Sequence, residues 1–104
     1  MITSKKRAKL RSIANNITPI FQIGKGGIND NLIQDLSNAL DARELIKLTV
    51  LKNSEVKAKD IINDLCKKLN AEPISAIGNK ITIYRYSTKE GVNHIELWEM
   101  IKHF

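Results

Sequence analysis

The fold is decided by residues 20–51, which read IFQIGKGGINDNLIQDLSNALDARELIKLTVL. The first four are mostly β-branched or aromatic, which predicts a short strand. A helix is predicted to follow, with Asn29 or Asp30 as its N-cap. Its buried face is predicted from apolar residues at helical spacing: Leu32, Ile33, Leu36 and Leu40. Residues 45–51 predict a second strand, so the whole stretch is expected to form a right-handed parallel crossover.

Side chains in this second strand alternate in polarity, which predicts a sheet with two unlike faces. Ile46, Leu48 and Val50 fall on one face, while Lys47 and Thr49 fall on the other. We therefore expect the second face to be open to water or only lightly covered.

The flanking sequence supplies further elements of the same kind. Residues 3–15 are typical of a helix with one apolar stripe. The stripe is made by Leu10, Ile13, Ala14 and Ile17. Residues 57–69 predict another helix, and residues 73–77 and 80–86 predict two strands. Glycine followed by asparagine at positions 78 and 79 predicts a two-residue type II′ turn between these strands.

Together these elements predict the fold class α/β. We expect a two-layer sandwich, with an N-terminal helix, then the order β-α-β-α-β-β, and a mixed four-stranded sheet. One domain over residues 1–86 accounts for the pattern, and residues 87–104 form a C-terminal tail. Asn93 followed by Glu96 is consistent with a short helix in that tail, and an extended arm is equally consistent.

Composition favours a single domain in a reducing compartment. A chain of 104 residues is long enough for one modest core. Its one cysteine, Cys66, cannot form an internal disulfide. No apolar run is long enough to span a membrane, and the basic N-terminal region lacks the apolar segment and cleavage site of a signal peptide. We therefore expect a cytoplasmic protein.

The net charge of +6 is concentrated at the start of the chain. Residues 1–29 contain no acidic residue and six basic ones: Lys5, Lys6, Arg7, Lys9, Arg11 and Lys25. Residues 30–104 contain 11 basic and 11 acidic residues, so their charges sum to zero. A local positive field attracts polyanions, namely nucleic acid, an anionic membrane surface or an acidic protein.

The loop Gly24-Lys25-Gly26-Gly27 has a chemistry that suits a phosphodiester. Glycine lets the backbone approach a ligand closely, and the amides and dipole of a following helix favour an anion. Lys25 adds a positive charge. RNA-binding KH domains use a Gly-x-x-Gly loop in this manner. The same glycines are also compatible with a simple tight connection between a strand and a helix.

Two other phosphate-binding motifs do not fit this loop. A nucleotide-hydrolysing P-loop needs Ser or Thr after its Gly-Lys pair, where this chain has Gly26. A dinucleotide-binding fingerprint needs a glycine at position 29 and an acid at the end of the next strand. The chain has Asn29 at the first of these positions and Leu51-Lys52 at the second.

Several segments, in a fixed order, resemble one known family. They are Leu10-Arg11, residues 19–27 (PIFQIGKGG), residues 42–47 (ARELIK), and Ile77-Gly78-Asn79 before a strand that ends in Tyr84-Arg85. This pattern covers roughly residues 3–86 and is similar to the YhbY proteins. These are the stand-alone bacterial form of the CRM domain, named for chloroplast RNA splicing and ribosome maturation.

The resemblance implies a fold like that of the C-terminal domain of bacterial translation initiation factor three. It also implies RNA binding through the glycine loop and the adjacent basic surface, and association with precursors of the large ribosomal subunit. Similar plant domains support intron splicing. Residues 24–27 match the family's loop, and the basic residues of the first helix match its basic face. The tail beyond Ser87 lies outside the shared domain.

We therefore predict an RNA-binding protein that contacts ribosomal RNA during assembly of the large subunit. The candidate RNA-binding residues are Gly24, Lys25, Gly26, Gly27, Lys5, Lys6, Arg7, Lys9, Arg11 and Lys47. Lys47 is included because it projects from the open sheet face. We expect no enzymatic activity, cofactor, metal ion, small-molecule substrate or membrane association. A monomer is favoured, although the sequence leaves the oligomeric state open.

Two competing functions remain open at this point. In the first, the chain is a protein-interaction module whose basic helix docks on an acidic ribosome-associated partner, with Trp98 as a hydrophobic anchor. In the second, the first helix attaches to a membrane surface. The membrane hypothesis ranks last, because the apolar stripe of the helix is narrow and lacks aromatic residues.

Reactive and aromatic side chains have plainer interpretations. Cys66 lies one helical step from the inward-facing stripe of its helix and is expected to be a partly buried small residue. A catalytic role for its thiol would need a histidine partner, and both histidines, His94 and His103, fall in the tail. One cysteine and two histidines are too sparse for a structural metal site. Tyr84 and Tyr86 are candidates for base stacking, but ordinary sheet packing is the favoured interpretation.

Basic residues outside the N-terminal region also have structural interpretations. Arg43 is explained by the dipole of the helix that it ends. Lys80 and Arg85 flank the last strand and are interpreted as residues that deter edge pairing.

Overall fold

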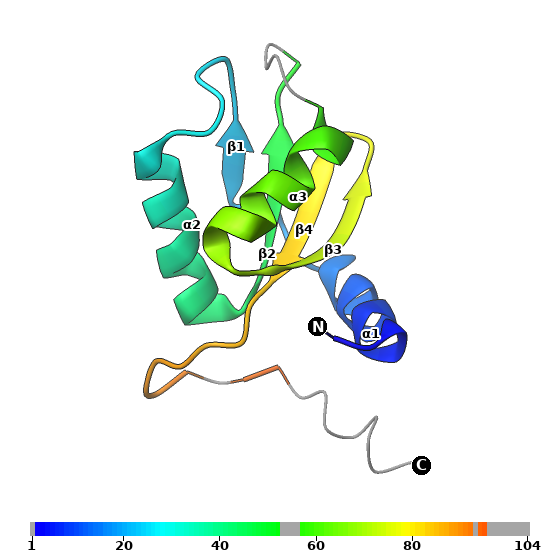
Figure 1. Cartoon of the computed structure of the whole chain (residues 1–104). Helices are drawn as coiled ribbons and strands as arrows, with labels where there is room; N and C mark the ends of the chain where they lie inside the picture. Colours follow the sequence, from blue (N-terminus) through cyan, green and yellow to red (C-terminus); the bar gives the residue numbers. More distant parts are fainter. Residues whose placement is uncertain (1, 53–56, 93, 96–104) are drawn as a thin grey trace.

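The computed structural model describes residues 2–52, 57–92, 94 and 95 (Figure 1). In this part of the chain the elements are α1 (Ser4–Ala14), β1 (Phe21–Ile23), α2 (Asp30–Arg43), β2 (Leu45–Val50), α3 (Ala58–Leu69), β3 (Glu72–Ile77) and β4 (Lys80–Tyr84). This is the predicted order, and the α/β fold class is confirmed. The N-cap of α2 is Asn29, whose side chain accepts a hydrogen bond from the amide of Leu32 at 2.8 Å. The predicted tail helix at Asn93 and Glu96 lies outside the described residues.

The strands form one mixed sheet in the order β1-β2-β4-β3. β1 pairs in parallel with β2, as the predicted crossover requires, and β4 pairs antiparallel with both β2 and β3. Gly78 has a φ of 59° at the first position of the β3–β4 turn, as a type II′ turn requires. Because β4 is paired on both sides, the interpretation of Lys80 and Arg85 as guards of an edge strand is wrong.

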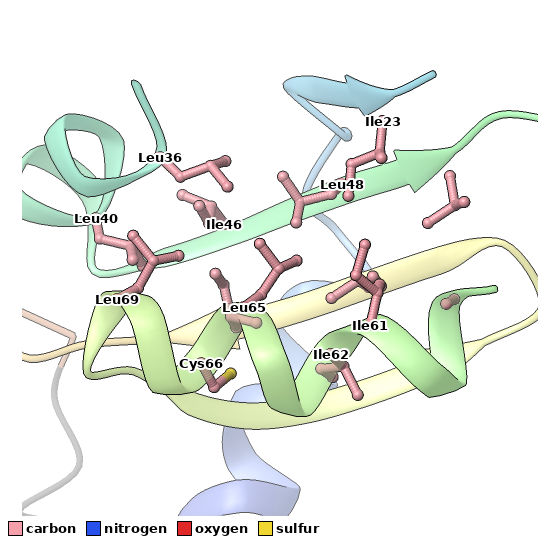
Figure 2. Packing of buried hydrophobic residues seen from close by; sticks show 14 residues of the cluster. Ile23, Leu36, Leu40, Ile46, Leu48, Ile61, Ile62, Leu65, Cys66 and Leu69 are labelled. Carbon is pink, nitrogen blue, oxygen red and sulfur yellow. The ribbon is translucent and has the colours of Figure 1, made fainter. Parts of the chain in front are cut away.

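Helices α2 and α3 cover one face of the sheet and enclose the main core (Figures 1 and 2). From β2, this core takes Ile46, Leu48 and Val50, whereas Lys47 and Thr49 are only partly buried. The predicted alternation of β2 is therefore confirmed. From the two helices, the core includes Leu36, Leu40, Ile61, Ile62, Leu65 and Leu69.

Helix α1 packs on the opposite face of the sheet and covers only one end of it. Leu10 and Ala14 form a second buried cluster with Leu45, Ile74 and Tyr84. Leu45 and Tyr84 are paired residues at the start of β2 and the end of β4. The other half of this face has no helix over it among the described residues (Figure 1).

Arg85, directly after β4, joins both helices of the main core. Its Nη1 donates to the carbonyl of Leu69 at the end of α3, at 2.8 Å. Its Nη2 donates to the carbonyl of Ser37 at 2.8 Å, to the Ser37 hydroxyl at 3.0 Å and to the Asp41 carboxylate at 3.0 Å. A guanidinium holds its donors in a rigid planar fork, so these bonds fix α2, α3 and the exit of β4 relative to one another.

Replacing Arg85 with methionine is expected to lower the free energy of unfolding by about 1–3 kcal/mol, because the Leu69 and Ser37 carbonyls lose their charged donor. Urea titration followed by circular dichroism measures this loss. The control is Lys68→Met, which removes an exposed pair with Asp64 at 3.6 Å and is expected to cost less than about 0.5 kcal/mol. Equal losses in the two variants would contradict a clamping role for Arg85.

Candidate nucleic-acid interface

The Gly24–Gly27 loop is a tight turn at the end of β1. The amide of Gly27 donates to the carbonyl of Gly24 at 3.0 Å, which closes the turn. Gly27 has a φ of 63°, in the left-handed region that favours glycine. Lys25 stands exposed at the turn. The loop therefore presents a short piece of backbone at the edge of the domain (Figure 1), and Lys25 adds one exposed cation to it.

The backbone conformation of the loop requires a glycine at position 27 but not at position 26. A Cβ added at either position would meet no atom within 4 Å, so neither glycine is needed to avoid a neighbour. Gly27 is held at positive φ, but Gly26 is not. Neither packing nor backbone conformation explains a glycine at position 26. Its missing side chain leaves the backbone open to close approach from outside.

The start of α2 is less available to an anion than the sequence suggested. Asn29 already occupies the amide of Leu32, and Asp30 places a negative charge in the first helical turn. Asp30 therefore opposes a second anion at the helix dipole. The loop backbone and Lys25 are better placed than the helix amides to contact a phosphate.

The candidate residues on α1 differ in their surroundings. Lys5, Lys9 and Arg11 are exposed, and Lys6 is half-buried. Arg7 is turned toward β3, where its Nε donates to the carbonyl of Pro73 at 3.1 Å and its Nη2 lies 3.7 Å from the Glu72 carboxylate. These contacts dock α1 on the sheet, so Arg7 has a structural role that the sequence did not indicate.

Lys47 projects from the second sheet face, as predicted, but its ammonium group also has a structural partner. Its Nζ donates to the carbonyl of Ala14 at the end of α1, at 3.2 Å. The Ala14 carbonyl also accepts a hydrogen bond from the Ile17 amide at 3.1 Å, so Lys47 is a second donor to a carbonyl at the C-terminus of the helix. Lys47 therefore places its positive charge between α1 and the sheet.

The loop and α1 lie toward opposite ends of the sheet, although they are close in sequence (Figure 1). The loop follows Ile23, which is in register with Val50 at the end of β2. α1 packs on Leu45 at the start of β2. The six residues of β2 span roughly 17 Å. A ligand that contacts both the loop and α1 must therefore extend along the sheet.

The two tyrosines that the sequence analysis named have different environments. Tyr84 is 5% exposed within the second cluster, so the packing interpretation is confirmed for it. Burial, with the charge of Glu44 next, raises the pKa of its hydroxyl to about 12. Tyr86 is exposed, but its ring stacks on that of His94 with centroids 4.4 Å apart.

Cys66 is buried, in agreement with its predicted packing role. Burial raises the pKa of its thiol to about 11, and the nearby charge of Glu72 adds to this effect. The thiol is therefore a poor nucleophile at neutral pH. His94 contacts Glu44 and Tyr86 instead, and His103 lies outside the described residues.

Two kinds of feature, a metal-binding cluster and a membrane-spanning helix, are absent from the described part of the chain. Within it, no three or more His, Cys, Asp or Glu side chains are grouped as they would be to hold a metal ion. No helix in the same ranges is both long and apolar enough to cross a membrane.

Glu44 is an important residue that the sequence analysis missed. It follows α2 with a φ of 66°, and it is fully buried with 0% exposure. Its Oε2 accepts from the Ser87 amide at 2.6 Å and lies 2.7 Å from Nδ1 of His94, and its Oε1 accepts from the Ile95 amide at 2.8 Å. A glutamate at a helix C-terminus opposes the dipole, and that signal could have identified it.

The contacts of Glu44 also attach the first part of the C-terminal tail to the domain. They fix Ser87, His94 and Ile95 to the end of α2, beyond the predicted domain boundary at residue 86. Ile95 also packs against the second buried cluster. That boundary stays a prediction, since residues 96–104 lie outside the described part of the chain.

The ionisation of Glu44 depends on these same contacts. Burial raises the pKa of the carboxyl group, but the hydrogen bonds from Ser87, His94 and Ile95, together with the charge of His94, outweigh burial. The pKa therefore lies below its ordinary value of 4.5. A depressed pKa means that the charged form stabilises the fold above the unfolded-state pKa, and that this stabilisation is lost as the pH falls.

Comparison with known proteins identifies the class of domain that carries this loop and sheet. Residues 2–85 match the CRS1 / YhbY (CRM) domain, and the chain belongs to that family. The resemblance inferred from the sequence motifs is thus confirmed.

Particular relatives support the assignment. The probable RNA-binding protein YqeI of Bacillus subtilis is 47% identical over 87 residues, which cover 84% of this chain and 91% of that protein. A Haemophilus influenzae protein named RNA-binding protein is 27% identical over 83% of this chain and 87% of its own length. These relatives are named for RNA binding and not for a reaction, in agreement with the expectation that the chain is not an enzyme.

A solved structure has the same fold. The solution structure of the hypothetical protein SAV1595 from Staphylococcus aureus, a candidate RNA-binding protein, superposes with a TM-score of 0.76 and 45% sequence identity. The match covers 93% of this chain and 99% of that one.

Two alanine substitutions test which glycine of the loop the fold requires for its stability. Gly27→Ala is expected to lower the free energy of unfolding by about 1 kcal/mol, because its φ of 63° is unfavourable for a residue with a Cβ. Gly26→Ala is expected to change it by less than about 0.5 kcal/mol, or to raise it slightly. Urea denaturation of the two variants measures both. A large loss for Gly26→Ala would mean that the fold itself requires this glycine.

Glu44→Gln is expected to lower the free energy of unfolding by about 1–3 kcal/mol at neutral pH, because a buried charged acceptor is replaced by a neutral amide. The deficit relative to the wild type is expected to shrink as the pH falls below 4.5, where the unfolded wild-type glutamate becomes protonated. Chemical denaturation over a pH series measures it, with the exposed Glu90→Gln as control. A deficit that is independent of pH would contradict this assignment.

Proposed function

We propose that this chain binds RNA, and that its target is ribosomal RNA in precursors of the large ribosomal subunit, in the cytoplasm. Membership of the CRM family and the names of the relatives support RNA binding. The ribosomal target rests on the family resemblance described above.

The observation that carries the proposal is the open backbone of the Gly24–Gly27 loop. Gly26 has no neighbour within 4 Å of a Cβ position and no unusual φ, yet it lacks a side chain beside the exposed Lys25. A phosphate can therefore come close to the loop amides while Lys25 supplies charge. In this proposal the loop holds the RNA backbone without reading its sequence.

Helix α1 extends the contact in this proposal. Four cations of this helix are exposed or half-buried, and their charges attract phosphates: Lys5, Lys6, Lys9 and Arg11. Arg7 contributes indirectly, because it holds α1 on β3. Lys47 contributes charge next to the end of α1.

Binding to ribosomal RNA is expected to depend strongly on salt. With about four phosphate contacts to a single-stranded segment, log K is expected to fall with log salt at a slope of roughly −3. Lys25→Asp/Gly26→Asp is expected to lose most of its affinity and to show a flatter slope, because it places two negative charges against the RNA backbone. Fluorescence anisotropy at several salt concentrations measures both quantities, after circular dichroism establishes that the variant folds.

Matched variants separate charge from backbone access. Gly26→Ala keeps every charge and is expected to weaken binding about tenfold, the effect of losing roughly one hydrogen bond to a charged group. Lys25→Ala is compared with Lys67→Ala, which removes the same charge from the exposed surface of α3. Binding by the loop variants that equals that of the wild type would make the loop a simple connection.

The ribosomal target requires a separate experiment. The tagged protein is expected to cosediment with precursors of the large subunit, and nuclease treatment is expected to release it. A complex that survives nuclease would favour the acidic protein partner instead. Equal affinity for ribosomal RNA and unrelated structured RNA would argue against a ribosomal target.

A further inference from the structure

A cavity of about 390 Å³ lies between the last turn of α1 and the uncovered half of the second sheet face. Three cations from different elements line it: Arg11 of α1, Lys47 of β2 and Lys80 of β4. The lining contains no Asp or Glu among the described residues. The cavity is therefore an electropositive hollow outside the glycine loop.

The fold produces this hollow because α1 is too short to cover the whole face. The helix ends at Ala14, after packing on the apolar end of the face at Leu45 and Tyr84. Beyond that point, Lys47 is in register with Thr82, and Thr82 with Ser75, so polar side chains cross three adjacent strands. These side chains form the floor of the cavity.

The lysines of the cavity keep their charge available. Nζ of Lys47 donates to the carbonyl of Ala14 at 3.2 Å, and Nζ of Lys80 donates to the hydroxyl of Thr49 at 2.9 Å. Both acceptors are neutral, and an ammonium group has three donors, so these bonds leave the positive charge and further donors for a ligand. The bonds also hold both side chains in place, which reduces the entropy lost on binding.

An apolar side chain lies beside these cations. Ile77 is 73% exposed and also lines the cavity. A nucleotide has the matching combination of groups, an anionic phosphate and a flat base with apolar faces. The volume lies in the range of small-ligand sites, so it suits one nucleotide rather than a duplex.

The cavity lies within reach of a strand of RNA held by the loop. Thr49 of β2 is in register with Gln22 of β1 on one side and with Lys80 of β4 on the other. Two strand spacings, roughly 10 Å, therefore separate Lys80 from the strand that leads into the loop. Arg11 borders the same cavity from α1, so the cavity lies between the two basic regions that the sheet keeps apart.

We propose that this cavity binds one unpaired nucleotide of the RNA strand whose backbone is held by the Gly24–Gly27 loop, an inference that rests on the proposed function. Arg11, Lys47 and Lys80 contact the phosphates on either side of its ribose, and Ile77 packs against its base or ribose. A base in a duplex stays stacked and paired, so the site selects single-stranded RNA.

The test measures binding of a short single-stranded oligouridylate and of a duplex of equal length. Arg11→Gln/Lys80→Gln is expected to bind the single strand about tenfold more weakly, with a salt slope smaller by about 1.4, which corresponds to two lost phosphate contacts. Lys67→Gln/Lys89→Gln removes the same charge from exposed positions outside the cavity and is expected to stay within about twofold of the wild type. Ile77→Ala is expected to weaken binding without changing the salt slope. Lys80→Arg keeps the positive charge and is expected to retain the affinity of the wild type.

The outcomes separate this proposal from the one on which it rests. If Gly26→Ala weakens binding while Arg11→Gln/Lys80→Gln and Ile77→Ala bind like the wild type, the nucleotide site is overturned and the loop proposal stands. Equal losses for single strand and duplex also overturn the site, because a surface charge effect explains them. If the wild type binds no RNA, the proposed function falls and the cavity proposal falls with it.

Discussion

The arrangement of this protein depends on the alternation of side chains along β2. Ile46, Leu48 and Val50 lie in the main core under α2 and α3, and so Lys47 and Thr49 must face the other way. A one-residue shift in register would bury the lysine and expose the apolar residues, so burial strongly fixes the pairing. The polar face that remains is a consequence of the core, and it is the face on which the proposed nucleotide site lies.

Charged side chains in this structure divide into two groups by their partners. Glu44 accepts two backbone amide bonds and contacts His94, and Arg85 donates to two backbone carbonyls and to Asp41. The charges of Glu44 and Arg85 are therefore compensated by hydrogen bonds within the fold. Among the residues that the structure describes, Lys47 and Lys80 each have one neutral acceptor, so their positive charges remain uncompensated. Partner chemistry, rather than exposure alone, therefore separates the cations that stabilise the fold from those that we propose to contact RNA.

Sequence periodicity predicted the elements and the mixed sheet because both depend on local spacing and on the two-faced pattern of β2. It missed the roles of Arg7 and Glu44. The partners of Arg7 are 65 and 66 positions away in the chain, and those of Glu44 are 43 to 51 positions away. The family resemblance also led us to expect the loop and the basic helix to lie next to each other. A connection from Ala14 to Phe21 can run back along the sheet, and only the three-dimensional path shows that the loop and α1 lie toward opposite ends.

The distance between the Gly24–Gly27 loop and α1 explains why the uncovered sheet face matters for the proposed RNA binding. If the loop and α1 adjoined, a few phosphates could bridge them and no surface in between would matter. Because β2 separates them by its length, a strand of RNA that reaches both must pass over Lys80, Lys47 and Arg11 or detour around the sheet. On the direct path these three cations neutralise phosphates and release counterions that are condensed on the RNA, whereas a detour forgoes this favourable contribution. Electrostatics therefore favours the path across the cavity, and the neutral partners of Lys47 and Lys80 keep that path charged in the free protein.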